Sequence, residues 1–401
     1  EGPITVSDMG WRHPLCDAFI EGAGELGIPR NADYNGERQE GACYTQRAIQ
    51  DGRRMSTARA YLHPVLGRPN LHVICRAHSQ RILFDGRRAV GVEYTVRGQT
   101  LRAYAGEILS CAGSINSPQL LQLSGVGPAA LLREHGIDVV ADMPGVGAGM
   151  QDHYLIRMVY RCKQPVTLND VMQSRVRSVG TLLRYALFRR GMMAMAAVPT
   201  GGFFRSDPSR DTPDLQHHIV LYSNGGATGK HGSTLHEFSG LSATIIMLRP
   251  ESRGAVEIGS ADPRDAPLIK SRYLSAENDS RALMRGVRAV QEIMRQPALE
   301  PFVGEAIEPG ADVVTDDDVI AYLRNFGNTG FHPTSTCRMG VDETAVVDPR
   351  LRVHGIDGLR VIDASVIPTS HSANTNAATI MIAEKAADMI LGKPPLPAAP
   401  V

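Results

Sequence analysis

The sequence predicts an α/β protein that has more than one folding unit. A chain of 401 residues exceeds the length at which a single hydrophobic core usually suffices, so we expect two domains or one domain with a large insertion. A β-rich run at 101–111 passes through small residues into a helical pattern, and a compact β-run at 359–362 also precedes a helix. The stretch 155–330 mixes strands and helices and is expected to form a separate layer.

The first helix is predicted over Pro14 to Leu26, and it decides how a nearby glycine motif is interpreted. Apolar residues recur there at helical spacing, and Gly27 followed by Pro29 ends the pattern. Residues 22–27 read GAGELG, a literal G-x-G-x-x-G. That motif binds a dinucleotide between a strand and the start of a helix, whereas here it lies in the last turns of a helix. We therefore expect no phosphate site at these glycines.

An antiparallel meander is predicted after a long polar loop. Four β-rich runs are separated by turn residues such as Asp85-Gly86 and Gly98-Gln99. The runs are LHVIC (71–75), RILF (81–84), AVGVEYTV (89–96) and LRAYAGEILSC (101–111).

The last of these runs leads into a turn and a helix. Ala112-Gly113 form the turn, and Ser117-Pro118 are expected to supply the N-cap and the first residue of the helix. A strand, a turn of small residues and a helix allow the backbone to approach a nucleotide closely.

The stretch 155–330 is expected to supply a substrate pocket. It opens with a basic amphipathic helix over Val171 to Arg190 and continues with three short strands and two helices. The strands are predicted near 215–222, 243–250 and 254–259, and the helices over 276–296 and 316–326.

The final hundred residues contain a strand and a helix joined by a polar segment. The strand, Leu359 to Ile362, ends in Asp363-Ala364-Ser365, and the helix is expected from about Asn376 to Leu391. Four unpaired N–H groups and a partial positive charge must lie at the start of this helix. Such a helix start suits an anionic group.

Composition excludes some classes of function. Lys+Arg and Asp+Glu both number 42, so nothing favours a nucleic-acid partner, which would require a basic surface. No apolar run reaches the ~18 residues of a membrane helix, so we expect no integral membrane segment, although peripheral association stays open. The chain opens on EGPITVSDMGW, without an initiator Met or a signal peptide, which suggests a fragment or a trimmed chain.

Cysteine usage points to a reducing compartment. The six cysteines are scattered and form no C-x-x-C pair, which favours reduced thiols over disulfides or a zinc site. We therefore predict a cytoplasmic location. A metal site at His332, His354 and His371 is not expected, because no pair has the close spacing of common ligand sets.

Four stretches, in order, resemble the glucose-methanol-choline (GMC) flavoprotein oxidoreductases, with the choline-dehydrogenase-like branch the most similar. They are GSINSPQLLQLSGVGP (113–128), PGVGAGMQDH (144–153), FHPTSTCRMG (331–340) and the long C-terminal stretch 346–390, and 252–275 also resembles the family's substrate-domain sheet. The resemblance implies a Rossmann-type FAD-binding domain interrupted by a substrate-binding domain with an antiparallel sheet and helices. It also implies an enzyme that oxidises the CH–OH group of a small-molecule alcohol, such as a primary alcohol to an aldehyde.

The domain boundaries implied by the resemblance divide the chain into five parts. They are 1–70 as a linker or lid region of the FAD domain, 71–154 as FAD-binding domain, 155–330 as substrate-binding domain, 331–395 as the C-terminal part of the FAD domain, and 396–401 as a tail. Family members begin with a strand, a G-x-G-x-x-G turn and a helix, which this chain lacks. Either upstream sequence was omitted or the chain binds FAD poorly alone. A smaller departure is Gly149, where the family usually has Asn.

Two residues carry the chemistry that the resemblance implies. His332 would be the base or the hydrogen-bonding group for the alcohol oxygen, since imidazole titrates near neutral pH. Asn374 would bind the same oxygen from the opposite side, at a position where relatives carry Asn or His. Taken alone, His332 would be a structural loop histidine and Asn374 a turn residue or N-cap. The neighbouring His371 is expected at the pocket edge or the surface.

The cofactor contacts implied by the resemblance fall at three places. Asp363 and Ala364 would lie beside the pyrophosphate and ribityl chain of FAD. Asn374, Asn376 and their helix start would face the flavin. Ala112, Gly113 and the backbone near Ser79 would hold the adenosine half, although a tight turn and a capping acid are the simpler interpretations of these residues in isolation.

Two alternatives to alcohol oxidation remain open from the sequence. A lyase on the same fold could retain FAD without redox turnover, because fold alone does not fix function. A non-catalytic or incomplete FAD-binding fragment is the other alternative. The sequence does not identify the alcohol, or whether the electron acceptor is oxygen, a quinone or another compound.

Overall fold

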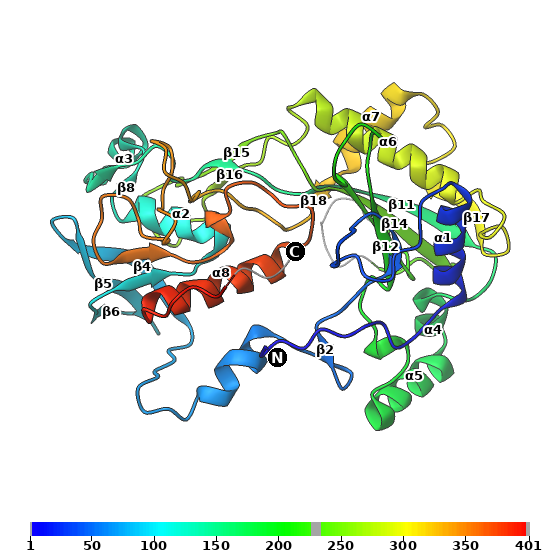
Figure 1. Ribbon diagram of the computed structural model, residues 1–401, viewed down its shortest axis with the longest axis horizontal. Coiled ribbons are helices and arrows are strands. Elements are labelled where there is room, and N and C mark those ends of the chain that lie inside the picture. Colours follow the sequence, from blue (N-terminus) through cyan, green and yellow to red (C-terminus); the bar gives the residue numbers. More distant parts are fainter. Residues whose placement is uncertain (1, 226–233, 398–401) are drawn as a thin grey trace. The chain divides into compact units, whose positions relative to one another are not determined.

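The computed structural model describes residues 2–225 and 234–397, which divide into two compact units (Figure 1). The first, called here the sheet unit, comprises 1–72, 154–248 and 277–329. The second, called here the α/β unit, comprises 73–153, 249–276 and 330–401. Each unit is therefore assembled from three separate stretches of chain.

The sheet unit is built on one antiparallel sheet in which distant strands become neighbours. Its strands run in the order β1 (Gly41–Tyr44), β12 (Thr200–Phe204), β13 (Leu215–Val220), β14 (Gly240–Met247), β11 (Tyr154–Cys162) and β17 (Val303–Glu308), and β18 (Asn328–Thr329) also pairs with β11. β13 and β14 confirm the strands predicted near 215–222 and 243–250.

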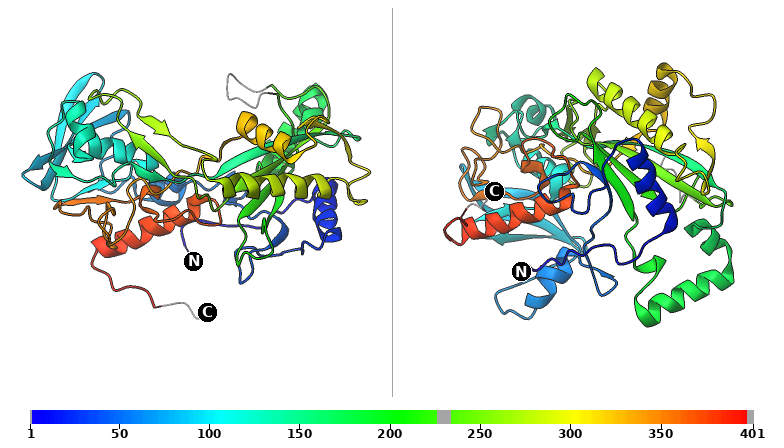
Figure 2. Two further views of the ribbon diagram at one scale, coloured as in Figure 1. Left: turned by 90° about the horizontal axis from the view of Figure 1, so that it is seen from above. Right: turned by 45° about the vertical axis from the view of Figure 1, so that its right-hand side comes forward.

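Helices cover this sheet, and one glycine sets how closely they approach. The predicted helices are confirmed as α1 (Pro14–Glu25), α6 (Glu277–Ile293) and α7 (Asp316–Phe326). α6 packs on β13 and β14 with α7 beside it (Figure 2). A Cβ at Gly286 would lie 2.8 Å from a Cγ2 atom of Ile245, so only glycine permits this close contact between helix and sheet.

The basic helix predicted over Val171 to Arg190 is broken in two. α4 (Leu168–Gln173) ends before Ser174, whose extended backbone interrupts the helical hydrogen bonds. α5 (Arg175–Phe188) then begins, because the Ser174 side chain accepts a hydrogen bond from the N–H of Arg177.

The α/β unit contains the predicted meander, but with corrected ends. β4 (Ala77–Asp85), β5 (Arg88–Val96) and β6 (Gln99–Tyr104) form an antiparallel sheet. The prediction of a strand at 71–75 was wrong, since these residues have no partner strand and Val73 and Ile74 are exposed. The run 101–111 is also two strands rather than one. Its second part, β7 (Ile108–Ser110), pairs in parallel with β19 (Leu359–Val361).

The helix after β7 starts earlier than predicted. α2 (Gly113–Leu123) has Ala112 as its N-cap residue, so Ser117-Pro118 lie inside the helix rather than at its start. Pro118 lacks the N–H that would bond the carbonyl of Ser114. The hydroxyl of Thr336 donates to that carbonyl at 2.7 Å, which satisfies the group and makes the internal proline tolerable.

The α/β unit also contains a second small sheet and a C-terminal helix. β10 (Ala148–Met150), β15 (Gly254–Glu257) and β16 (Leu268–Lys270) form a small antiparallel sheet. α8 (Thr375–Ile390) confirms the predicted C-terminal helix. Of its apolar residues, Ala386 is buried and Ile382 packs against the core, whereas Ile390 is exposed.

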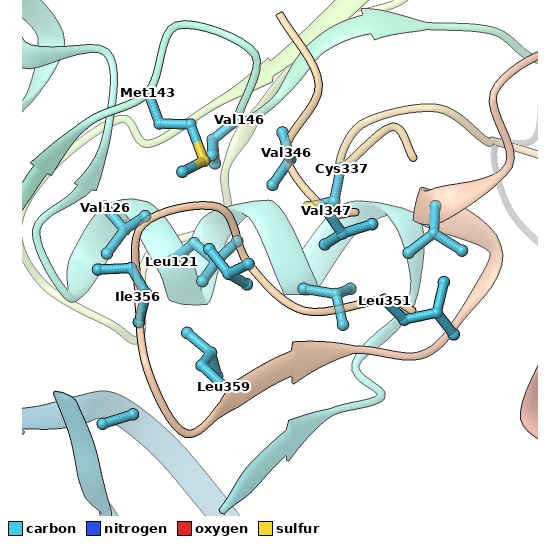
Figure 3. Close-up of a cluster of buried hydrophobic side chains, with 14 of the residues drawn as sticks. Leu121, Val126, Met143, Val146, Cys337, Val346, Val347, Leu351, Ile356 and Leu359 are labelled. Carbon is cyan, nitrogen blue, oxygen red and sulfur yellow. The ribbon is translucent and has the colours of Figure 1, made fainter. Parts of the chain in front are cut away.

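The core of this unit joins α2 to the C-terminal stretch (Figure 3). Leu121 of α2 is fully buried among apolar residues that come from loops far along the chain. The labelled members of this cluster are Leu121, Val126, Met143, Val146, Cys337, Val346, Val347, Leu351, Ile356 and Leu359. These contacts hold residues 113–126 and 337–359 in one body.

Two predicted boundaries differ from the observed units. Residues 1–70 were assigned to the FAD domain, yet 1–72 lie in the sheet unit because β1 pairs with β12. Residues 249–276 were assigned to the substrate domain, yet they lie in the α/β unit because β15 pairs with β10. Across 2–225 and 234–397, no helix is both long enough and apolar enough to span a bilayer.

The core predicts a large stability loss on truncation of Leu121. Leu121→Ala removes a fully buried side chain and is expected to lower the free energy of unfolding by about 2–5 kcal/mol. Leu268→Ala, at a half-exposed position in the same unit, should cost less than about 1 kcal/mol. Urea unfolding followed by circular dichroism measures both variants. Equal losses would contradict the assignment of the core.

Candidate active site

Three loops of the α/β unit are tied together by hydrogen bonds. Gln151 and Thr334 exchange backbone hydrogen bonds of 3.2 and 2.8 Å, so the segments 151–153 and 330–335 pair like short strands. The side-chain amide of Gln151 donates to Ser335 Oγ at 3.1 Å, and its oxygen accepts from the N–H of Ser370 at 3.1 Å. We call the hydrogen-bonded set of Gln151, Thr334, Ser335 and Ser370 the loop tie, and all four residues are buried.

The loop tie fixes the backbone of His332. The N–H of His332 donates to Asp152 Oδ1 at 2.8 Å, and the N–H of Gly330 donates to the carbonyl of His153 at 2.6 Å. Phe331 between them has a φ of 58°, a strained conformation for a bulky residue. Asp152 also accepts a hydrogen bond from the hydroxyl of Tyr273. The imidazole therefore projects from a loop that is held on both sides.

The structure brings His332 and Asn374 together although 42 residues separate them. Asn374 is the residue before α8, and its side chain does not cap that helix. Instead, its Nδ2 lies 3.2 Å from Nε2 of His332. With Nδ2 of Asn374 assigned as the donor, Nε2 of His332 is the acceptor and carries a lone pair at this point.

A second histidine, which sequence reasoning missed, contacts the other ring nitrogen of His332. Nδ1 of His153 lies 3.0 Å from Nδ1 of His332, with the two rings nearly perpendicular at 85°. Since Nε2 of His332 accepts, its Nδ1 carries the hydrogen and donates to His153. Nε2 of His153 then donates to Ser370 Oγ at 2.9 Å. His153 and Ser370 are both buried, whereas His332 is half-buried.

Burial and charge act on His332 in opposite directions. Burial lowers the pKa of His332 below its ordinary value because an imidazolium is poorly solvated there, and the nearby His371 lowers it further. The carboxylate of Asp152 raises the pKa, but by less than burial lowers it. The imidazole is therefore neutral at neutral pH, as a proton acceptor must be.

Asp363 joins the turn after β7 to the segment after β19. Its Oδ2 accepts from the N–H of Gly113 at 2.9 Å and from Ser117 Oγ at 2.6 Å, while its Oδ1 accepts from the N–H of Ser365 at 2.8 Å. Asp363 is buried, so its carboxylate orients the backbone of the protein. Ala364 opens the short 3-10 helix η4 (Ala364–Val366) beside it.

The turn after β7 also borders an open pocket. Ser79 and Ala112 both line this cavity of about 210 Å³, with Asn116 beside them. The family resemblance assigned both residues to the adenosine half of FAD. Gly113 has a φ of 83°, and a Cβ there would meet no atom within 4 Å. Open space and small residues at the turn fit the close approach of a nucleotide.

The start of α8 carries the remaining predicted residues. Asn376 is exposed in the first turn, and His371 is half-buried with its Nε2 3.3 Å from the carbonyl of Asn374.

Gly149, where relatives usually have Asn, has a φ of 70° and open space in place of a side chain. Glycine and asparagine both tolerate that left-handed conformation, so this departure preserves the backbone.

Comparison with known proteins identifies the family. Residues 1–155 and 250–383 match the two family models described as GMC oxidoreductase. The chain is 42% identical over 407 residues to the oxygen-dependent choline dehydrogenase of Pseudomonas aeruginosa (strain LESB58), covering 99% of this chain and 71% of that protein. The chain belongs to the GMC oxidoreductase family. It is also 42% identical to the mitochondrial choline dehydrogenase of Homo sapiens, covering 99% of this chain and 66% of the human protein.

Solved structures support the same family. An FAD-dependent oxidoreductase from Chaetomium thermophilum is similar with a TM-score of 0.88 and 26% identity, covering 98% of this chain and 74% of that one. A formate oxidase from Aspergillus oryzae RIB40 gives a TM-score of 0.89 and 25% identity over 98% and 73% of the two chains.

Family membership confirms three predictions from the sequence. This GMC oxidoreductase has an α/β FAD-binding fold with an insert, its cofactor is FAD, and it is an enzyme that acts on the CH–OH group of an alcohol. Sequence reasoning did not assign roles to Gln151, Asp152 and His153. The signal was present, because these residues end the motif PGVGAGMQDH that carried the resemblance.

The site geometry predicts how the pKa of His332 responds to Asp152. Asp152→Asn removes the charge that raises this pKa, so the pKa should fall further below its ordinary value. Titration of the histidine ring protons by NMR, with His332 assigned by its loss in His332→Gln, measures the shift. Asp388→Asn, which alters an exposed ion pair in α8, is the control and should leave the pKa unchanged. A rise in Asp152→Asn would contradict the charge assignment.

Proposed function

We propose that this GMC oxidoreductase oxidises a primary alcohol to an aldehyde, with His332 as the base and Asn374 as the second ligand of the alcohol oxygen. The observation that carries the proposal is the 3.2 Å contact between Nε2 of His332 and Nδ2 of Asn374. One group is an acceptor and the other a donor, and they come from different loops of the same unit. A hydroxyl needs both functions, since it donates its proton and its oxygen must be stabilised.

The tautomer of His332 whose Nε2 faces Asn374 is ready to accept a proton. A substrate hydroxyl would donate to the lone pair on Nε2 of His332 while its oxygen accepts from Nδ2 of Asn374. As the proton moves to Nε2, the ring becomes an imidazolium, whose Nδ1–H stays bonded to His153. The carboxylate of Asp152 favours that cation electrostatically. When bound, FAD supplies the acceptor for the hydride that leaves the carbinol carbon.

The same unit offers residues that would hold FAD. Ser79, Ala112 and Gly113 line or border the open pocket proposed for the adenosine half. Asp363 and Ala364 are proposed beside the pyrophosphate and ribityl chain, with Asp363 acting through the backbone that it orients. Asn374 and Asn376 are proposed to face the flavin, because the free N–H groups at the start of α8 favour negative charge. The α/β unit is accordingly the proposed FAD-binding domain and the sheet unit the proposed substrate-binding domain.

The names of the relatives suggest the first substrate to test. Choline is a primary alcohol with a quaternary ammonium group, and 3,3-dimethylbutan-1-ol has the same shape without the charge. A preference for choline would show that the substrate domain binds a cation. We propose a cytoplasmic location, supported by six free cysteines, and leave the electron acceptor open.

The proposal predicts that His332→Ala slows oxidation without releasing the cofactor. Loss of the base should lower the rate of flavin reduction by about 10² or more, whereas the FAD content should stay the same. Anaerobic stopped-flow mixing of FAD-loaded enzyme with the alcohol measures the rate through bleaching of the flavin absorbance. His354→Ala is the control, because the ring of His354 lies in a neighbouring loop with its Nε2 3.1 Å from the carbonyl of Gly340. Equal rates in His332→Ala and the parent would remove His332 from the mechanism, and a flavin that stays oxidised during turnover would indicate a lyase.

Asn374 gives a second, independent test of the site. Asn374→Ala removes the donor to the alcohol oxygen and should lower kcat/KM by about 10². Asn374→His retains a donor and should recover most of that loss. Steady-state kinetics with the same alcohol measure both variants. No difference between Ala and His at this position would show that donation to the substrate is not its role.

A further inference from the structure

Helix α5 of the sheet unit presents its apolar side to the outside. It has no buried residue, and in Figures 1 and 2 it projects from its own unit together with α4. Val176 is 83% exposed, Val179 and Leu183 are each 55% exposed, and Leu187 is 71% exposed. These four residues recur at intervals of three and four, so they form one continuous stripe along the helix.

The opposite side of α5 is polar, and it is the side that contacts the protein. Ser178, Thr181 and Tyr185 are half-buried along this side. Ser178 Oγ donates to the carbonyl of Val171 at 2.8 Å, and the hydroxyl of Tyr185 donates to the carbonyl of Gly52 at 3.0 Å. A helix on the surface of a globular protein normally buries its apolar stripe and exposes its polar one. α5 does the reverse, which is the pattern of a helix that lies on an apolar surface outside the protein.

The charge around the stripe indicates that the surface it contacts is negatively charged. Five arginines lie within or directly after α5, and no Asp or Glu occurs from 171 to 206. The arginines are Arg175, Arg177, Arg184, Arg189 and Arg190. Two copies of the chain packed through this helix about a two-fold axis would bring these like charges together, which disfavours self-association. An anionic bilayer offers both the apolar interior that the stripe requires and the negative charge that the arginines require.

We propose that α5 docks the protein on the surface of a bilayer that contains anionic lipids. Val176, Val179, Leu183 and Leu187 enter the interface between headgroups and acyl chains, and the arginines contact the lipid phosphates. Met172 in the preceding helix α4 and Phe188 at the last position of α5 are also exposed. The helix lies in the plane of the membrane and does not cross it, since it has only 14 residues.

The experiment is co-sedimentation of the FAD-loaded protein with vesicles. Vesicles of phosphatidylcholine with phosphatidylglycerol should bind it, vesicles of phosphatidylcholine alone should not, and added salt should weaken binding. Arg177→Gln with Arg184→Gln should lower the partition coefficient by about 30-fold. The matched control is Arg97→Gln with Arg133→Gln, two exposed arginines outside α5, which should change it little.

The apolar stripe is tested separately. Leu183→Asn with Leu187→Asn should lower binding by about tenfold or more, whereas Val341→Asn with Leu396→Asn, at exposed positions elsewhere, should not. Circular dichroism checks that each variant is folded. Equal binding to both vesicle types would overturn the proposal, as would an absence of binding. It would also be overturned if the Leu183 and Leu187 changes abolished a dimer, seen by sedimentation velocity, without affecting vesicle binding.

Discussion

The arrangement of the active site depends on the backbone pairing between Gln151 and Thr334. This pairing places Asp152 and His153 against the loop that carries His332, and the side chain of Gln151 extends the tie to Ser370. Two further contacts depend on this pairing. The N–H of His332 donates to Asp152, and the ring of His332 contacts the ring of His153. A shift of one residue would exchange the sides on which these groups point. The backbone pairing therefore determines where the side chains of the site lie.

Within that frame, two opposing effects adjust His332 for the proposed chemistry. Burial keeps the ring neutral in the resting enzyme, and Asp152 lowers the cost of protonation when the substrate transfers its proton. His153 adds a third contact, because its Nδ1 accepts a hydrogen bond from the Nδ1–H of His332 when Nε2 of His332 carries the lone pair. A base that is neutral at rest and supported when charged suits a proton transfer that must occur in both directions through the catalytic cycle.

Local patterns in the sequence predicted much of the fold, but not the features that depend on distant residues. Apolar spacing correctly located α1, α6 and α8, and turn residues located the meander of β4, β5 and β6. The start of α2 was misplaced because Ser117-Pro118 has the local sequence of a helix start. The helix begins at Gly113 instead, and Thr336 and Asp363, more than 200 residues away, stabilise its first turns. The pairing of His332 with Asn374 came from family resemblance, since no spacing rule connects loops 42 residues apart. His153 was missed although it ends the motif PGVGAGMQDH, because its contact with His332 joins loops 179 residues apart.

The proline inside α2 affects when this helix can reach its final structure during synthesis. The first turn of α2 is complete only when Thr336 supplies the hydroxyl that replaces a missing amide, and the strand before it pairs with residues 359–361. A ribosome releases the N-terminal half of this unit long before those partners exist. The packing of α2 and β7 in this unit is therefore completed only once residues 336–361 have been synthesised.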